Sequence, residues 1–159
     1  MGYVEQNLMP GEQVIYKAKL HWAMFIDPLV RILLGLAILV VFVTLYSGEA
    51  TASYGAIFGG LLLFAGVLQL LAAVTRFFTT EFGLTDRRII AKTGAIRRVS
   101  LELLLQKVES VTVDQPLLGR MLNYGTITVT GTGGTKQRFP HIADPMELRR
   151  RVNTQISGA

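Results

Sequence analysis

The sequence of 159 residues contains no cysteine. A chain without cysteine has no disulfide framework, no thiolate nucleophile and no cysteine-based metal site. Charged residues are scarce too, at 17% of the chain, where soluble domains carry about 25%. Hydrophobic residues make up 50%, and the mean hydropathy is +0.42. This composition is typical of a membrane protein.

The motifs of common catalytic sites are also missing. The two histidines, His21 and His141, lie far apart and have no metal-ligand spacing around them. No HExxH, GxSxG or paired-acid pattern occurs, and GTGGT at 131–135 lacks the helix and the Lys-Ser/Thr ending of a phosphate-binding loop. Nothing resembles a recognition helix for nucleic acid. We therefore predict a non-enzymatic protein with no cofactor, no metal and no nucleic-acid partner.

Two long apolar runs dominate the first half of the chain, at residues 28–46 and 54–75. About 20 apolar residues in a helix are enough to cross a hydrocarbon core of about 30 Å. No other part of the chain is large enough to cover two such helices in a soluble core. The runs predict a transmembrane helical hairpin over residues 28–75, preceded by an N-terminal segment, residues 1–27, that holds a short strand within EQVIYKAKLHW.

The distribution of basic residues predicts the orientation of this hairpin. The link SGEATAS between the two runs contains no Lys or Arg, whereas Lys17 and Lys19 precede the first run and Arg76 follows the second. Cytoplasmic flanks of membrane helices are enriched in basic residues. Both termini are therefore predicted to be cytoplasmic, with the Glu49 link on the other side.

Gly55 and Gly59 form a GxxxG pattern in the second run. Such a pattern lets two helices approach closely. The favoured target is the first helix of the same chain, because a hairpin with a short link must pack somewhere. Contact with a partner protein through Gly55 and Gly59 is the alternative.

Residues 77–159 have a different character, with short apolar runs broken by turn residues. The pattern predicts a strand–turn–strand unit over TTEFGLTDRRIIAKTG, a third strand in AIRRVSL, a fourth in LQKVESVTVD, and a hairpin over GTITVTGTGGTKQRFP. DPMELRRRVNTQI predicts a closing amphipathic helix with an apolar stripe of Met146, Leu148, Val152 and Ile156.

Several motifs taken together resemble the membrane-anchored bacterial pleckstrin-homology-like proteins, whose roles are mostly undefined. They are FGLTDRRIIAKTG, LQKVESVTVDQPLLGRMLNYGTITVTGTGG and HIADPMELRRRV, downstream of GEQVIYKAKLHW and two spans. The resemblance implies an α+β membrane protein of the bacterial inner membrane. In it, a two-helix transmembrane hairpin precedes a small pleckstrin-homology-like antiparallel β-barrel or sandwich, residues 77–159, capped by a C-terminal helix.

Basic residues close behind the hairpin form a candidate lipid-binding group: Arg87, Arg88, Lys92, Arg97 and Arg98. Each Lys or Arg near an anionic bilayer can contribute about 1 kcal/mol to binding. The simpler interpretation is that these residues only satisfy topology and pair with neighbours such as Asp86 or Glu102.

The apolar segment between two predicted strands is a candidate protein contact: Leu117, Leu118, Met121 and Leu122. An apolar segment of this size is expected to be buried against the rest of the domain, a membrane or another protein. We favour a helical turn that plugs the barrel over a surface that faces the membrane or a protein.

The function predicted from these features is a non-catalytic, membrane-anchored interaction module. It would be an accessory or scaffold subunit beside another integral membrane protein, or would self-associate into a homo-oligomer. The alternative is a module that binds anionic phospholipid at the cytoplasmic membrane face.

Overall fold

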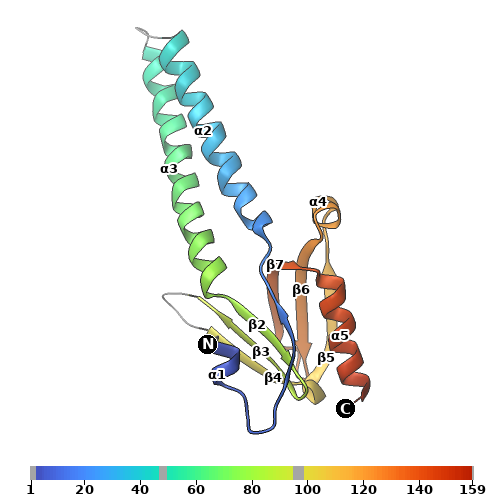
Figure 1. Cartoon of the computed structure of the whole chain (residues 1–159). Helices are drawn as coiled ribbons and strands as arrows, with labels where there is room; N and C mark the ends of the chain where they lie inside the picture. The colour runs from blue at the N-terminus through green and yellow to red at the C-terminus, as the bar shows by residue number, and fades with distance from the viewer. Residues whose placement is uncertain (1–2, 47–49, 95–98, 159) are drawn as a thin grey trace. The chain divides into compact units, whose positions relative to one another are not determined.

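A computed structural model describes residues 3–46, 50–94 and 99–158 (Figure 1). It contains two compact units. One, here called the helical hairpin, comprises Met24–Thr75, and the other, here called the β unit, comprises Met1–Ala23 together with Arg76–Ala159. The hairpin is thus inserted in sequence within the β unit.

The hairpin consists of α2 (Ile26–Leu45) and α3 (Ala50–Thr79). Both helices are long and apolar enough to cross a membrane, over Trp22–Leu45 and Ser53–Thr79. Only 11% and 17% of their most apolar windows are buried, whereas core helices of a soluble protein would be mostly buried. α3 is longer than predicted at both ends and includes Arg76 in its last turn. Of the predicted link, residues 47–49 lie outside the described residues.

Glycines bring the two helices of the hairpin into close contact. A Cβ atom added to Gly59 would lie 2.8 Å from the backbone nitrogen of Leu39, and one on Gly35 would lie 2.6 Å from that of Leu63. A Cβ on Gly55 would overlap the ring of Phe42. The GxxxG face is therefore used inside the hairpin, as the favoured interpretation predicted, and Gly55 and Gly59 are buried there.

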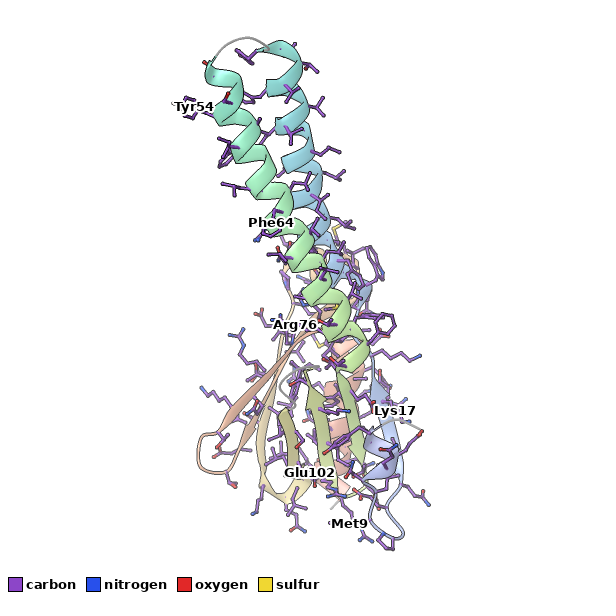
Figure 2. The ribbon with its side chains drawn as sticks, turned by 90° about the vertical axis from the view of Figure 1, so that its left-hand side faces the viewer. Met9, Lys17, Tyr54, Phe64, Arg76 and Glu102 are labelled. Atoms are coloured by element: carbon purple, nitrogen blue, oxygen red, sulfur yellow. The ribbon has the colours of Figure 1, made fainter. Side chains whose placement is uncertain are left out.

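Large apolar side chains cover the outside of the hairpin. Tyr54 and Phe64 of α3 are 75% and 60% exposed, and Figure 2 shows both pointing away from α2. On α2, Leu33 and Leu45 are 64% and 74% exposed. The hairpin thus has a narrow glycine-lined interior and a wide apolar exterior.

The β unit contains two antiparallel sheets. The first has the order β1-β2-β3-β4, with β1 at Val14–Ala18, β2 at Glu81–Thr85, β3 at Arg88–Thr93 and β4 at Val99–Leu104. The second has the order β5-β6-β7, with β5 at Val108–Asp114, β6 at Tyr124–Gly131 and β7 at Lys136–Ala143. Short helices are α1 (Tyr3–Gln6), η1 (Trp22–Phe25), η2 (Leu105–Lys107) and α4 (Leu117–Met121). The predicted strands are all present, and residues 95–98 of the third lie outside the described residues.

The strand that precedes the hairpin pairs with the strand that follows it. Ala18 of β1 lies opposite Phe82 of β2, and Lys17 lies opposite Gly83. The N-terminal segment, predicted as a separate region of residues 1–27, is therefore an integral part of the β unit. We call the end of the β unit that holds Leu20–Ala23 and Arg76–Thr80 the linker end, because the chain leaves for the hairpin and returns from it there.

The core of the β unit lies among the two sheets and α5 (Pro145–Gly158). Strand β6 alternates between partly exposed and buried residues, and its Ile127 and Val129 face the core, as a half-buried strand requires. From α5, Leu148 and Val152 pack against this core, with Ile156 at its edge. Met146 was predicted to join this stripe but is 55% exposed, because two residues along a helix of about 3.6 residues per turn it points away from Leu148, toward the face that holds Arg149.

The close approach of α2 and α3 at Gly59 predicts that a larger residue there destabilises the hairpin, and the neighbouring Gly60 provides a control. Gly59→Ala should lower the melting temperature of the detergent-solubilised full-length protein, because the new methyl group would push against the backbone of α2. Gly60→Ala should leave it unchanged or raise it slightly, since nothing lies within 4 Å of that site and alanine is favoured over glycine by up to about 1 kcal/mol in a helix. Equal effects of the two substitutions would contradict the observed helix pairing.

Candidate functional site

The predicted lipid-binding arginines begin in the turn between β2 and β3. Arg87 is exposed there, and its Nε atom lies 3.8 Å from a carboxylate oxygen of Asp86. The turn is held to the segment before β1 by two hydrogen bonds: the backbone N–H of Gln13 donates to Asp86 Oδ1 at 3.0 Å, and the N–H of Asp86 donates to the carbonyl of Gln13 at 3.2 Å. This turn lies at the other end of β2 from Glu81, which follows the return from the hairpin. Arg87 is therefore distal to the linker end, as the whole of β2 lies between them.

The neighbouring Arg88 is buried rather than exposed, with a side chain 6% accessible. Its Nε and Nη2 atoms donate to the two carboxylate oxygens of Glu12 at 2.9 and 2.8 Å. Its Nη1 atom donates to Glu102 at 2.5 Å, and Nη2 also donates to the carbonyl of Asn7 at 2.8 Å. The two-pronged contact with Glu12 is the strong form of an arginine–carboxylate pair. The guanidinium of Arg88 is thus hydrogen-bonded to groups inside the domain and is not accessible to a lipid headgroup.

Glu12 is the central acceptor of this cluster and is 6% exposed. Besides Arg88, the hydroxyl of Thr85 lies 2.7 Å from its Oε1 atom, and the amide of Met9 donates to Oε2 at 2.8 Å. The cluster fixes the chain before β1 against the β2–β3 hairpin. Figure 2 shows Met9 and Glu102 far from Arg76, so this fixed region lies away from the linker end.

The charges of the cluster shift each other's titration. The Arg88 guanidinium holds the pKa of Glu12 at about 2, although burial alone would raise it, and the hydrogen bonds from Met9 and Thr85 act in the same direction as Arg88. The Glu12 carboxylate in turn raises the pKa of Arg88. Glu12 is therefore ionised at every physiological pH, which makes it a structural ion and unsuited to act as a general base.

The remaining basic candidates are not gathered beside these arginines. Lys92 lies opposite Glu81, near the linker end, and its ammonium sits 4.7 Å from the ring centre of Tyr3. Arg97 and Arg98 lie outside the described residues. Within the described part of the chain, the predicted group is thus divided between the two ends of β2 and β3.

The apolar segment after β5 is a short exposed helix rather than a plug. α4 holds Leu117, Leu118 and Met121, which are 79%, 60% and 81% exposed, and Leu122 follows it half-buried. Figure 1 shows α4 at the end of the β5–β6 pair. The favoured prediction of a barrel plug is wrong, because α5 and the strands already fill the core. The prediction of a protein contact at these four residues stays a prediction.

Ring contacts link α4 to the point where the chain leaves for the hairpin. Tyr124, three residues after α4, stacks on His21 with ring centres 5.3 Å apart, and His21 lies 5.3 Å from Trp22. Tyr124 also stacks on His141 at 5.8 Å. The N–H of His21 donates to the carbonyl of His141 at 2.7 Å. α4 and Trp22 therefore lie at the same end of the β unit, the linker end.

The linker end also carries basic side chains. Lys19 and Arg76 are exposed and make no ion pair within the described ranges, whereas Lys17 lies 2.5 Å from Glu5. A cavity of about 350 Å³ opens there, lined among others by Lys17, Lys19 and Phe77. No sequence motif marks these residues as a site, although Lys17, Lys19 and Arg76 stand out in the sequence as the basic residues that flank the two apolar runs.

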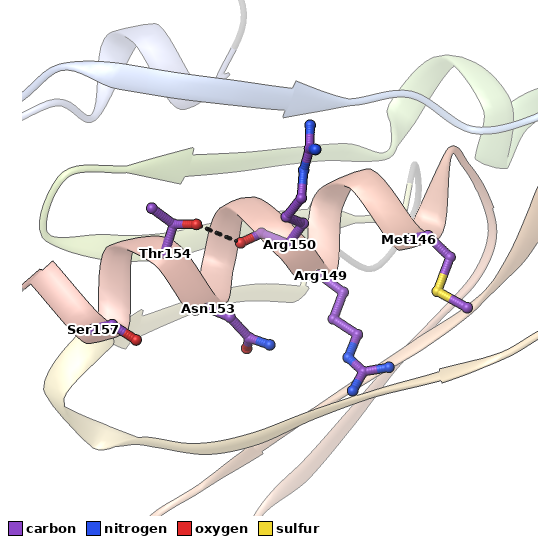
Figure 3. Close-up of a pocket in the computed structure, with 6 residues that line it drawn as sticks. All are labelled: Met146, Arg149, Arg150, Asn153, Thr154 and Ser157. Carbon is purple, nitrogen blue, oxygen red and sulfur yellow. Dashed lines mark hydrogen bonds between the residues drawn. The ribbon is translucent and has the colours of Figure 1, made fainter.

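A second hollow lies on the outer face of α5 (Figure 3). Six residues line it: Met146, Arg149, Arg150, Asn153, Thr154 and Ser157. Arg150 is paired with Glu147 at 2.5 Å, and Thr154 donates to the backbone carbonyl of Arg150 at 3.0 Å. Its ionisable lining residues are Arg149 and Arg150, and no carboxylate or histidine is among the described residues that line it. Among the described residues, no group of three His, Cys, Asp or Glu side chains could hold a metal ion.

A family model described as "Bacterial PH domain" matches residues 25–156. The match takes in both apolar helices and the β unit from β2 into α5. The chain belongs to the bacterial PH domain family. No curated protein and no solved structure matches it. The resemblance seen in the sequence is confirmed, and the PH domain here is an α+β unit of two antiparallel sheets and a C-terminal helix. Domains of this family are generally non-catalytic.

The buried arginine of the PH domain gives a stability prediction with its neighbour as control. Arg88→Ala should cost about 3–5 kcal/mol of unfolding free energy, because it leaves Glu12 buried without a counter-charge. Arg87→Ala removes only an exposed pair and should cost less than about 1 kcal/mol. Chemical denaturation of the full-length protein in detergent measures both. Similar losses for the two variants would show that Arg88 is not the buried partner of Glu12.

The same cluster predicts how stability depends on pH. The pKa of Glu12 is about 2 in the folded protein and ordinarily 4.5, so its contribution is fully present above about pH 4.5 and is lost as the pH falls through 2. The shift corresponds to about 3 kcal/mol. Glu12→Gln should therefore be less stable than the wild type at pH 7, with the difference shrinking between pH 4.5 and 2. A difference independent of pH would contradict the ionised state of Glu12.

Proposed function

We propose that this PH domain protein is a non-catalytic, membrane-anchored interaction module. It acts as an accessory or scaffold subunit of a membrane protein assembly, which includes an assembly of its own copies. The observation that carries the proposal is the hairpin, whose glycine face is sealed inside while residues such as Phe64 and Leu33 stay exposed. A surface of this kind requires an apolar environment.

A lipid bilayer is the environment that fits the hairpin. The apolar spans contain 24 and 27 residues, which at 1.5 Å per residue give about 36 and 40 Å. A hydrocarbon core of about 30 Å is crossed by such helices with some tilt. Trp22 is the first residue of the first span, at the position where interfacial aromatic residues are enriched.

The basic residues favour one orientation in the bacterial inner membrane. Lys17 and Lys19 lie before the first span, and Arg76 lies in the last turn of α3. The positive-inside rule places these flanks, both termini and the PH domain in the cytoplasm. The hairpin then keeps the domain at the membrane surface, where its high local concentration favours even weak contacts.

The partner in this proposal is another integral membrane protein or a second copy of the chain. Because Gly55 and Gly59 are used within the hairpin, a partner inside the bilayer would meet the outer apolar face, for example at Ile57 and Phe58, which are each 60% exposed. Recognition of anionic lipid by the predicted arginine group is not proposed. Arg88 is committed to Glu12, and Arg87 lies away from the linker end.

The orientation can be tested by labelling, since the chain has no native cysteine to remove. A membrane-impermeant maleimide should label Ser53→Cys in intact spheroplasts, and Ser157→Cys only after the inner membrane is opened. The protein should remain in the membrane on carbonate extraction. Labelling of both positions only after lysis, together with release by carbonate, would contradict a membrane-spanning hairpin.

Assembly is tested separately by native mass spectrometry of the full-length protein extracted in mild detergent. The proposal expects either a second polypeptide in fixed stoichiometry or a defined number of copies of this chain. Recovery as a monomer that carries only anionic lipid would overturn the interaction module and favour lipid recognition.

A further inference from the structure

We propose that α4 dips into the membrane interface beside Trp22, so that the PH domain touches the bilayer directly as well as through the hairpin. The contact surface, here called the apolar tip, consists of Leu117, Leu118, Met121 and Trp22. The inference rests on the proposed membrane anchoring and adds to it the part of the domain that meets the lipid.

Position is the first argument. The chain leaves the β unit after Ala23, one residue beyond Trp22, and enters α2 at Ile26, so the linker end must lie at the bilayer surface when α2 is embedded. α4 lies at this same end, because Tyr124 stacks on His21, the residue before Trp22. An added Cβ on Gly119 would lie 2.6 Å from the carbonyl oxygen of Tyr124, so α4 is seated closely on the start of β6. The tip is therefore fixed to the side of the domain that faces the lipid.

The chemistry of the tip is the second argument. Its three α4 side chains are 60–81% exposed, and Trp22 is 55% exposed. Arg120 projects from the same short helix, is exposed, and makes no ion pair with any described residue. Apolar side chains with tryptophan on one side and basic residues at the rim are the composition of segments that lie in a membrane interface. Lys19 and Arg76 extend the basic rim toward anionic headgroups.

A protein partner fits the same tip less well. Stable protein interfaces bury about 800 Å² on each partner. α4 has only five residues, and the exposed polar residues Asp114 and Asn123 lie close before and after it. Only Pro116 and the half-buried Leu122 extend its apolar surface along the chain. A shallow lipid contact does not need more, because the hairpin already holds the domain in place.

The test uses the full-length protein in nanodiscs of phosphatidylethanolamine and phosphatidylglycerol. A fluorescent label is attached to Met121→Cys and, as a matched control, to Thr132→Cys. Thr132 lies just beyond the end of β6 that is opposite α4. The 8 residues of β6 separate the two sites by roughly 25 Å, at about 3.3 Å per strand residue. A label on Phe64→Cys reports whether the hairpin itself is embedded. We expect lipids with a shallow nitroxide to quench the Met121 label several-fold more than the Thr132 label, and a water-soluble quencher to show the reverse.

The other outcomes are distinguishable. If the Met121 label behaves like the Thr132 label while Phe64 is shielded from water, the inference is overturned and the anchored module stands. If Phe64 is also open to water, the proposed anchoring fails and the inference fails with it. If Met121 is shielded from both quenchers and cross-links to a second polypeptide, α4 is a protein contact and not a lipid contact.

The native tryptophan supplies a label-free second measurement, since Trp22 is the only tryptophan in the chain. Brominated lipids should quench its emission in the wild type. Leu117→Glu combined with Met121→Glu should reduce this quenching several-fold, because two carboxylates would lift the tip from the interface. Leu104→Glu, which alters an exposed leucine next to η2, should not change it. If the quenching of Trp22 is unchanged in the Leu117→Glu, Met121→Glu double variant, Trp22 and α4 do not form one membrane contact and the inference is overturned.

Discussion

The pairing of β1 with β2 is the constraint on which the rest of the structure depends. These strands lie on either side of the hairpin in sequence, and they are hydrogen-bonded neighbours in one sheet, with Ala18 opposite Phe82. The chain therefore leaves the PH domain and returns to it at one end. The hairpin is thus inserted in sequence between two neighbouring strands of one sheet.

Two kinds of interaction support this arrangement from opposite ends of the domain. At the distal end, the buried pair of Glu12 and Arg88 holds the segment before β1 against the β2–β3 turn. At the linker end, the rings of His21 and Tyr124 join the last part of the N-terminal segment to the second sheet. A buried ion pair adds little net stability but is costly to break, so it acts mainly as a lock on the position of β1.

Much of the fold could be predicted from the sequence, because local patterns carried the information. The apolar runs, the alternation in β6 and the turn at Gly131–Gly134 are all local signals, and the elements they predicted are present, although α3 extends beyond the predicted run at both ends. Long-range partners were not visible in this way. Arg88 looked like a surface residue because it follows a turn, and its partner Glu12 lies 76 positions earlier, across the hairpin. Leu118 looked like a core residue because it is apolar, and only the packing of α5 shows that the core is already full.

The account makes the N-terminal segment a strand of the PH domain rather than a separate tail. Hydrogen–deuterium exchange of the full-length protein in nanodiscs tests this most directly. The amides of Val14–Ala18 should exchange as slowly as those of Glu81–Thr85, because the two strands share one ladder. Exchange of Val14–Ala18 within seconds, while Glu81–Thr85 and Arg88–Thr93 stay protected, would contradict the account. The hairpin would then follow a separate N-terminal tail rather than a strand of the domain.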